Sequence, residues 1–103
     1  MEHLNADDAI ELAEIFHLLG DASRLRIVYA CLEAPVSSGL LAEGLGLSPS
    51  LVSHHLRLLR AARILTSDRQ GRQIFYSAVD DHIRGMVRDM VVHIKEDYGE
   101  VEE

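Results

Sequence analysis

The 103-residue sequence contains one cysteine, two prolines, no tryptophan and five aromatic residues in all. A single cysteine excludes an intrachain disulfide and a four-cysteine zinc site. So few aromatic residues leave little surface for stacking single-stranded bases. No apolar run approaches the roughly 18 residues that a membrane-spanning helix needs, and the acidic start of the chain is unlike a signal peptide. We therefore expect one cytoplasmic domain, spanning residues 1–103, with no membrane partner.

Acidic and basic residues are separated along the chain, although the net charge is −7. Residues 1–23 hold six acidic residues and no lysine or arginine. Residues 24–72 hold seven arginines and three acidic residues, whereas residues 73–103 hold eight acidic and three basic ones. A basic middle segment between acidic ends can carry a DNA-binding surface that the net charge conceals.

Apolar spacing predicts two helices in the first third of the chain. The first covers residues 8–19 and ends at Gly20; the second covers residues 22–34, begins at the cap Asp21 and ends before Pro35. The apolar stripe of the first helix consists of Ile10, Ala13, Phe16 and Leu19.

A short helix, a tight turn and a further helix are predicted over about residues 38–63. Gly46 marks the turn, and Ser48 followed by Pro49 is a strong helix start. The expected apolar face of the further helix consists of Leu51, His55, Leu58, Leu59 and Ala62. Its opposite, polar face consists of Ser50, Ser53, His54 and Arg57. Such a helix, directly after a glycine-containing turn, is typical of the DNA-reading helix of a helix-turn-helix, and His55 is expected at the edge of the core.

Beyond Arg63 the hydrophobic period changes to two, which predicts a hairpin wing over about residues 64–79 with Arg69 and Arg72 at its tip. A long helix follows over about residues 81–97, and Asp80 and Asp81 can cap its start. Its apolar stripe consists of Ile83, Val87, Met90, Val91 and Ile94. The fold class is therefore mainly α with a small β-hairpin, in winged helix-turn-helix order. We expect a homodimer held by the first and last helices, because this stripe is too apolar for a monomer surface.

Two kinds of side chain are needed to bind duplex DNA: short donors and acceptors that reach base edges, and cations that hold phosphates. The candidates for the first role are Ser50, Ser53 and His54. The candidates for the second role are Arg57, Arg69 and Arg72. Any solvated helix face or hairpin turn can carry these residue types, but the separated charge and the element order favour DNA.

A second set of residues has the chemistry of a metal site. It consists of Asp80, His82, His93 and Glu96. Carboxylate and imidazole groups suit tetrahedral Zn²⁺ or Co²⁺. On one helix the two histidines would share a face but lie about 16.5 Å apart, so one chain cannot close the site. Antiparallel packing of two copies of this helix would create two equivalent four-ligand sites. The alternative without a metal is that Asp80 is a helix cap, His82 a residue of the first turn, and His93 and Glu96 a polar seam of a dimer helix.

The run SPSLVSHHLRLL, the wing RQGRQIFYS and a last helix that opens with Asp-x-His together resemble the ArsR/SmtB family of metal-responsive repressors, over about residues 10–97. The resemblance implies base contacts at Ser50, Ser53 and His54, a DNA-binding wing at residues 69–72, and a zinc-type site on the last helix at the four positions above. The cysteines of the family's thiol site are missing from residues 36–45. Histidines beyond His93, which nickel sensors of this layout add, are also missing, so Ni²⁺ is less favoured than Zn²⁺ or its surrogate Co²⁺.

The leading hypothesis is a zinc-responsive transcriptional repressor whose metal-free dimer holds operator DNA and whose metal-bound form releases it, so that metal efflux or sequestration genes are derepressed. One alternative is a winged-helix DNA-binding regulator that does not respond to metal. Another is a dimeric protein-interaction module whose acidic ends engage other proteins. An enzyme is not expected, since no Ser-His-Asp or Cys-His set lies on neighbouring predicted elements.

Overall fold

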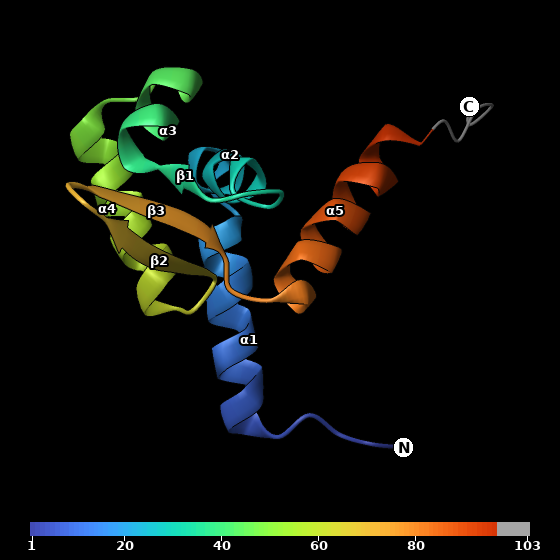
Figure 1. Ribbon diagram of the computed structural model, residues 1–103. Coiled ribbons are helices and arrows are strands. Elements are labelled where there is room, and N and C mark those ends of the chain that lie inside the picture. Colours follow the sequence, from blue (N-terminus) through green and yellow to red (C-terminus); the bar gives the residue numbers. More distant parts are fainter. Residues whose placement is uncertain (97–103) are drawn as a thin grey trace.

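The computed structural model describes residues 1–96, in which five helices and three strands follow one another (Figure 1). In chain order they are α1 (Ala6–Leu19), α2 (Ala22–Ala30), β1 (Val36–Ser37), α3 (Ser38–Leu45), α4 (Pro49–Ala61), β2 (Leu65–Gln70), β3 (Gln73–Ala78) and α5 (Asp81–Lys95). This is the predicted winged helix-turn-helix order, with α3 and α4 as the helix-turn-helix and β2 and β3 as the wing. Within residues 1–96, every helix is too short or too polar to span a membrane.

Each helix begins at a polar side chain that accepts a hydrogen bond from the backbone N–H three residues further on. These caps are Asn5, Asp21, Ser37, Ser48 and Asp80. A cap of this kind stabilises a helix by about 1 kcal/mol. The predicted caps at Asp21, Ser48 and Asp80 are confirmed. The first helix begins two residues earlier than predicted, because Asn5 caps it.

The segment after α2 differs from the prediction. The helix ends at Ala30 instead of continuing to residue 34, and the carbonyl of Cys31 accepts a hydrogen bond from the N–H of Ala78 at 3.2 Å. Residues 36 and 37 then form β1, which pairs antiparallel with β3 and places Val36 opposite Tyr76. The predicted hairpin is therefore part of a three-stranded sheet in the order β1-β3-β2.

The hydrophobic core lies between α2, α3, α4 and the base of the sheet. The largest fully buried side chains are Ile27, Val28, Leu41, Val52, Leu59, Ile64 and Leu65. Cys31 is also fully buried, as expected for a small apolar residue, and burial raises the pKa of its thiol to about 12. A thiol in this environment packs and does not react.

The apolar stripes of α1 and α5 are only partly covered by the rest of the chain. Figure 1 shows α5 held near its first turn and leaning away from the body. Ile83 and Val87 are buried, whereas Met90 is 52% and Ile94 is 74% exposed. On α1, Leu19 is buried and Phe16 is 53% exposed. The exposed ends of both stripes are available to a second molecule.

Candidate nucleic-acid interface and metal site

The turn between α3 and α4 has the tight geometry of a helix-turn-helix. Gly46 ends α3 with a φ of +69°, a left-handed conformation that favours glycine, and the N–H of Leu47 donates to the carbonyl of Ala42 at 3.0 Å. Ser48 then caps α4, and Pro49 occupies its first turn. The local sequence therefore fixes where α4 begins.

The two faces of α4 are clearly divided. Its buried face consists of Val52, His55, Leu56 and Leu59. Its exposed face includes all four predicted polar residues, Ser50, Ser53, His54 and Arg57. The predicted apolar face was wrong in part: Leu51 is 39% exposed, and Val52 and Leu56 face the core instead.

His55 lies inside the fold, at the contact between α4 and the start of α2. The residue is 6% exposed, and Nε2 lies 3.9 Å from Oδ2 of Asp21. Among the described residues, Nδ1 of His55 has no hydrogen-bond partner. Burial lowers the pKa of His55, although the carboxylate of Asp21 opposes the shift. The ring is therefore neutral near neutral pH, which agrees with the expected position at the core edge.

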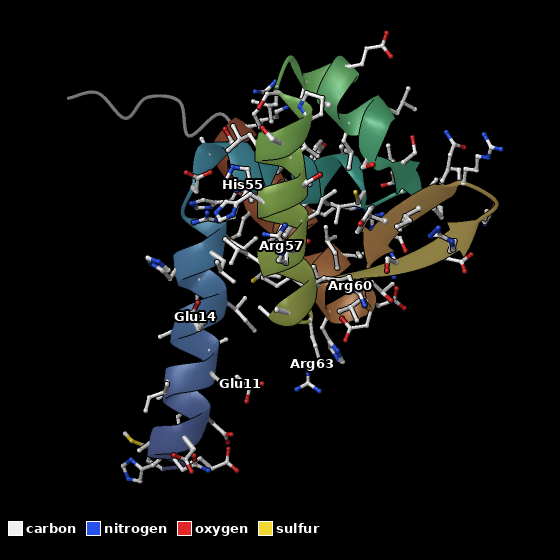
Figure 2. All side chains as sticks on the ribbon, turned by 90° about the vertical axis from the view of Figure 1, so that its left-hand side faces the viewer. Glu11, Glu14, His55, Arg57, Arg60 and Arg63 are labelled. Atoms are coloured by element: carbon white, nitrogen blue, oxygen red, sulfur yellow. The ribbon has the colours of Figure 1, made fainter. Side chains whose placement is uncertain are left out.

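The wing carries its arginines at the tip. Gln70 pairs with Gln73, and Gly71 in the connecting turn has a φ of +67°. Arg69 and Arg72 flank this glycine and are both exposed. Figure 2 shows Arg57 and Arg60 on the outward side of α4, with the wing on the side of α4 opposite to α1. The predicted base-reading and phosphate-binding residues are thus all accessible.

Asp80 and His82, two of the four predicted metal ligands, lie next to each other at the start of α5. Oδ1 of Asp80 accepts a hydrogen bond from the N–H of Ile83 at 3.1 Å, and Oδ2 lies 3.5 Å from Nδ1 of His82. The hydrogen bond from Ile83 lowers the pKa of Asp80, and His82 lowers it further. Both side chains are exposed, so Asp80 is an ionised carboxylate beside an accessible imidazole.

The other half lies at the far end of the same helix. His93 is in the last turn of α5, and Glu96 is its C-terminal cap, where the N–H of Glu96 donates to the carbonyl of His93 at 3.4 Å. Within residues 1–96, no three His, Cys, Asp or Glu side chains come close enough to hold a metal ion. The four predicted ligands are thus divided between the two ends of α5. Asp97, the predicted end of the helix, lies outside the described residues.

An apolar groove separates α1 from α5. Its volume is about 470 Å³, and its lining includes Phe16, Leu25, Met90, Val91 and Ile94. Arg84 and Arg88 of α5, for which no role was predicted, fasten the helix to the segment after α2 through bonds to Leu32 and Glu33, more than 45 positions away. No local sequence pattern could have revealed contacts at that separation.

Comparison with known proteins identifies the fold and the family. Residues 21–67 match the family described as "bacterial regulatory protein, arsR family". Over 95 residues the chain is 37% identical to the "transcriptional repressor SmtB homolog" of Synechocystis, a match that covers 92% of this chain and 72% of that protein. The chain belongs to the ArsR family.

Solved structures of other ArsR-type proteins have the same architecture. The solution structure of apo-NmtR is 30% identical, with a TM-score of 0.77 over 100% of this chain and 87% of that one. The domain of Mb0332 from Mycobacterium bovis, described as a homodimeric winged helix-turn-helix DNA-binding domain, has a TM-score of 0.81 over 100% and 98% at 16% identity, which supports the fold alone. The winged helix-turn-helix fold is confirmed, and the named relatives are transcriptional regulators, not enzymes.

Proposed function

We propose that this ArsR-family chain is a homodimeric, metal-sensing transcriptional repressor. Its metal-free dimer would bind operator DNA through α4 and the wing, and Zn²⁺ would weaken that binding. One observation carries the proposal: potential metal ligands stand at the two opposite ends of α5, with Asp80 and His82 at its start and His93 and Glu96 at its end. A helix so equipped can supply all four ligands to one metal ion only together with a second copy.

The DNA-binding part of the proposal is supported by the arrangement of exposed side chains. Ser50, Ser53 and His54 lie on one exposed face near the start of α4, the position from which a helix-turn-helix reads base edges. Arg57 follows on the same face, and the exposed wing tip adds Arg69 and Arg72. Hydroxyl and imidazole groups can discriminate bases, whereas guanidinium groups bind phosphates of any sequence.

A second copy of the chain is the partner that the apolar groove between α1 and α5 favours. Exposed Phe16 and Ile94 come from different helices, and a soluble monomer rarely exposes a contiguous apolar patch of this kind. Two equivalent metal sites then follow from a twofold axis.

The donor set suits Zn²⁺. Imidazole nitrogens and carboxylate oxygens both occur as ligands in zinc sites, and no thiolate accompanies them here, since the only cysteine is buried in the core. Co²⁺ suits the same set as a spectroscopic surrogate, and Ni²⁺ is less favoured. When bound, the metal would cross-link the start of one α5 helix to the end of the other.

The consequence for DNA binding follows from the geometry of the dimer. The cross-link would fix the angle between the two α5 helices and therefore the spacing of the two α4 helices. Two recognition helices can enter successive major grooves only when their spacing matches one turn of the duplex, about 34 Å. A metal ion that binds the conformation with mismatched spacing more tightly than the DNA-binding conformation lowers the affinity of the dimer for the operator.

The proposal is tested by selecting a duplex from a random-sequence pool with metal-free protein and measuring its binding by fluorescence anisotropy at fixed salt. Zinc should weaken wild-type binding by about tenfold or more. His82→Ala should bind the same duplex but not respond to zinc. His17→Ala, which removes an exposed histidine of α1, is the matched control and should respond like wild type.

Two outcomes contradict the proposal and identify the alternatives. If no duplex is enriched and binding to duplex DNA does not depend on salt, the chain is a protein-interaction module. If a duplex is enriched but zinc leaves its affinity unchanged in wild type, the chain is a DNA-binding regulator that does not respond to metal.

A further inference from the structure

Arg84, in the second turn of α5, makes hydrogen bonds to three separate parts of the chain. Nε donates to the carbonyl of Leu32 at 3.1 Å, and Nη2 donates to the carbonyl of Ala78 at 3.3 Å. Nη1 lies 2.8 Å from Oδ1 of Asp81. The side chain of Arg84 is 30% exposed, so most of its surface is covered by the rest of the chain. One side chain thus connects α5, the segment after α2 and the last residue of the wing.

Ala78 is the point at which these elements meet. It ends β3, pairs with Leu65 of β2, and donates its N–H to the carbonyl of Cys31 at 3.2 Å. Its carbonyl accepts from Arg84, and its side chain is buried. Two residues later, Asp80 caps α5. The base of the wing and the proposed metal ligands Asp80 and His82 are therefore only a few residues apart. Arg84 bonds Ala78 at the base of the wing and Asp81, which lies between the two proposed ligands in the sequence.

Arg88 offers an internal comparison, because it has the same side chain and lies one turn further along the same helix. It pairs with the carboxylate of Glu33, with Nη2 at 2.6 Å and Nε at 3.0 Å from Oε2. Both partners are substantially exposed, and the pair joins α5 to the segment after α2 rather than to a strand of the wing. Arg88 therefore fastens α5 to the body but not to the sheet. Ile83 and Val87, which are buried, anchor the helix independently of either arginine.

We propose that Arg84 is the positioning residue that couples the metal site to the wing. The inference rests on the proposed function. A shift in the first turn of α5, imposed on Asp80 and His82 by the cross-link, reaches Ala78 through the guanidinium group and so moves the strands that carry Arg69 and Arg72. The planar guanidinium group can hold two carbonyls at once, which a lysine ammonium group cannot do in the same geometry.

The test compares Arg84→Ala, Arg84→Lys and Arg88→Ala with wild type in the full chain. Operator affinity is measured with and without Zn²⁺, and metal affinity is measured separately from the visible absorption of Co²⁺ in the absence of DNA. In Arg84→Ala the zinc effect on operator affinity should fall by about tenfold, towards no effect, while Co²⁺ affinity changes by less than about threefold. Arg84→Lys should be intermediate, and Arg88→Ala should keep the wild-type zinc effect.

A second readout does not depend on metal. The N–H groups of Ala78 and Val79 are hydrogen-bonded to Cys31 and Ile64. Their amide exchange in the metal-free protein should be faster in Arg84→Ala than in Arg88→Ala, because only the first variant frees the base of the wing. Arg84→Lys, which retains one donor group, also keeps the test informative if Arg84→Ala does not fold.

The outcomes separate this inference from the proposed function. If zinc affects wild type, and Arg84→Ala and Arg84→Lys respond as wild type does, the inference is wrong and the proposed function stands. If Arg88→Ala loses as much of the zinc effect as Arg84→Ala, the effect reflects general loosening of α5 and the inference is again wrong. A wild type that does not respond to zinc contradicts both.

Discussion

The guanidinium group of Arg63 lies 3.4 Å from the carboxylate of Glu11, so the second residue beyond α4 contacts the first helix of the chain (Figure 2). Arg63 is the only non-glycine residue with a positive φ in the described part of the chain, at 61°. The N–H of Ile64 donates to the carbonyl of Leu59 at 2.9 Å and closes the end of the helix. Glycine is the usual residue at such a position.

Arg63→Gly should therefore stabilise the fold. An L-residue in the left-handed region costs roughly 1–2 kcal/mol, and the greater freedom of glycine in the unfolded chain offsets part of that gain. The exposed ion pair with Glu11 contributes little. We expect the free energy of unfolding in urea to rise by about 0.5–1 kcal/mol.

Arg60→Gly, inside the same helix, is the control and should lower the free energy of unfolding by about 1 kcal/mol. A destabilisation of similar size in Arg63→Gly would show that the contact with Glu11 outweighs the backbone strain.

The proposed division of α4 between base reading and phosphate binding predicts two different kinds of variant. Arg57→Ala should weaken binding to selected and random duplexes alike and reduce the dependence of affinity on salt. Ser53→Ala should weaken only the selected duplex, by about 1–3 kcal/mol for one base contact. Competition binding against both duplexes over a range of salt concentrations distinguishes the two. Equal losses on both duplexes in both variants would contradict the assignment of this face.

His55 should make stability depend on pH. Its folded-state pKa lies below the usual value of 6.5, chiefly because the ring is buried. As the pH falls below the unfolded value, the unfolded chain takes up a proton that the folded chain does not, so stability falls. The pKa of Asp21 is also lowered, mainly by the N–H of Arg24, so this carboxylate loses its contribution only at more acidic pH.

Urea unfolding between about pH 7 and pH 5 should therefore show a loss of stability that His55→Leu reduces. His17→Leu alters an exposed histidine and should leave the loss unchanged. An NMR titration that gives His55 a pKa above the usual value would contradict this account directly.

The proposed dimer interface can be tested without DNA or metal. Phe16→Glu places a charge in the apolar groove between α1 and α5 and should convert the dimer to a monomer in sedimentation experiments at micromolar concentration. Leu40→Glu changes a side chain on α3 that is similarly exposed, at 59%, but does not line the groove, so it should remain dimeric. A wild-type monomer would refute the interface.

Much of the fold could be predicted because the decisive signals are local. The caps Asp21, Ser48 and Asp80 and the glycines at 46 and 71 each act within three or four residues, so the sequence pattern alone locates the helix starts and turns. The exposed polar face of α4 followed from the same local reasoning.

The features that were missed depend on contacts distant in sequence. A two-residue strand has no periodicity, and β1 exists only because Val36 meets Tyr76, 40 positions away. Leu51 and Val52 are adjacent apolar residues, and helical spacing allows either of them on the buried face of α4. The packing of the folded core determines that Val52 is the buried one. The bonds of Arg84 to Leu32 and Ala78 likewise require the folded chain.

Coupling between zinc binding and DNA binding is tested by measuring the zinc affinity of the dimer with and without the selected duplex. Coupling between two ligands is reciprocal, so DNA must weaken zinc binding by the same factor by which zinc weakens DNA binding. The account predicts that the duplex lowers zinc affinity about tenfold or more, and that His82→Ala binds no zinc at this site in either state. Equal zinc affinities for the free dimer and its DNA complex would contradict the account and leave the metal site structural.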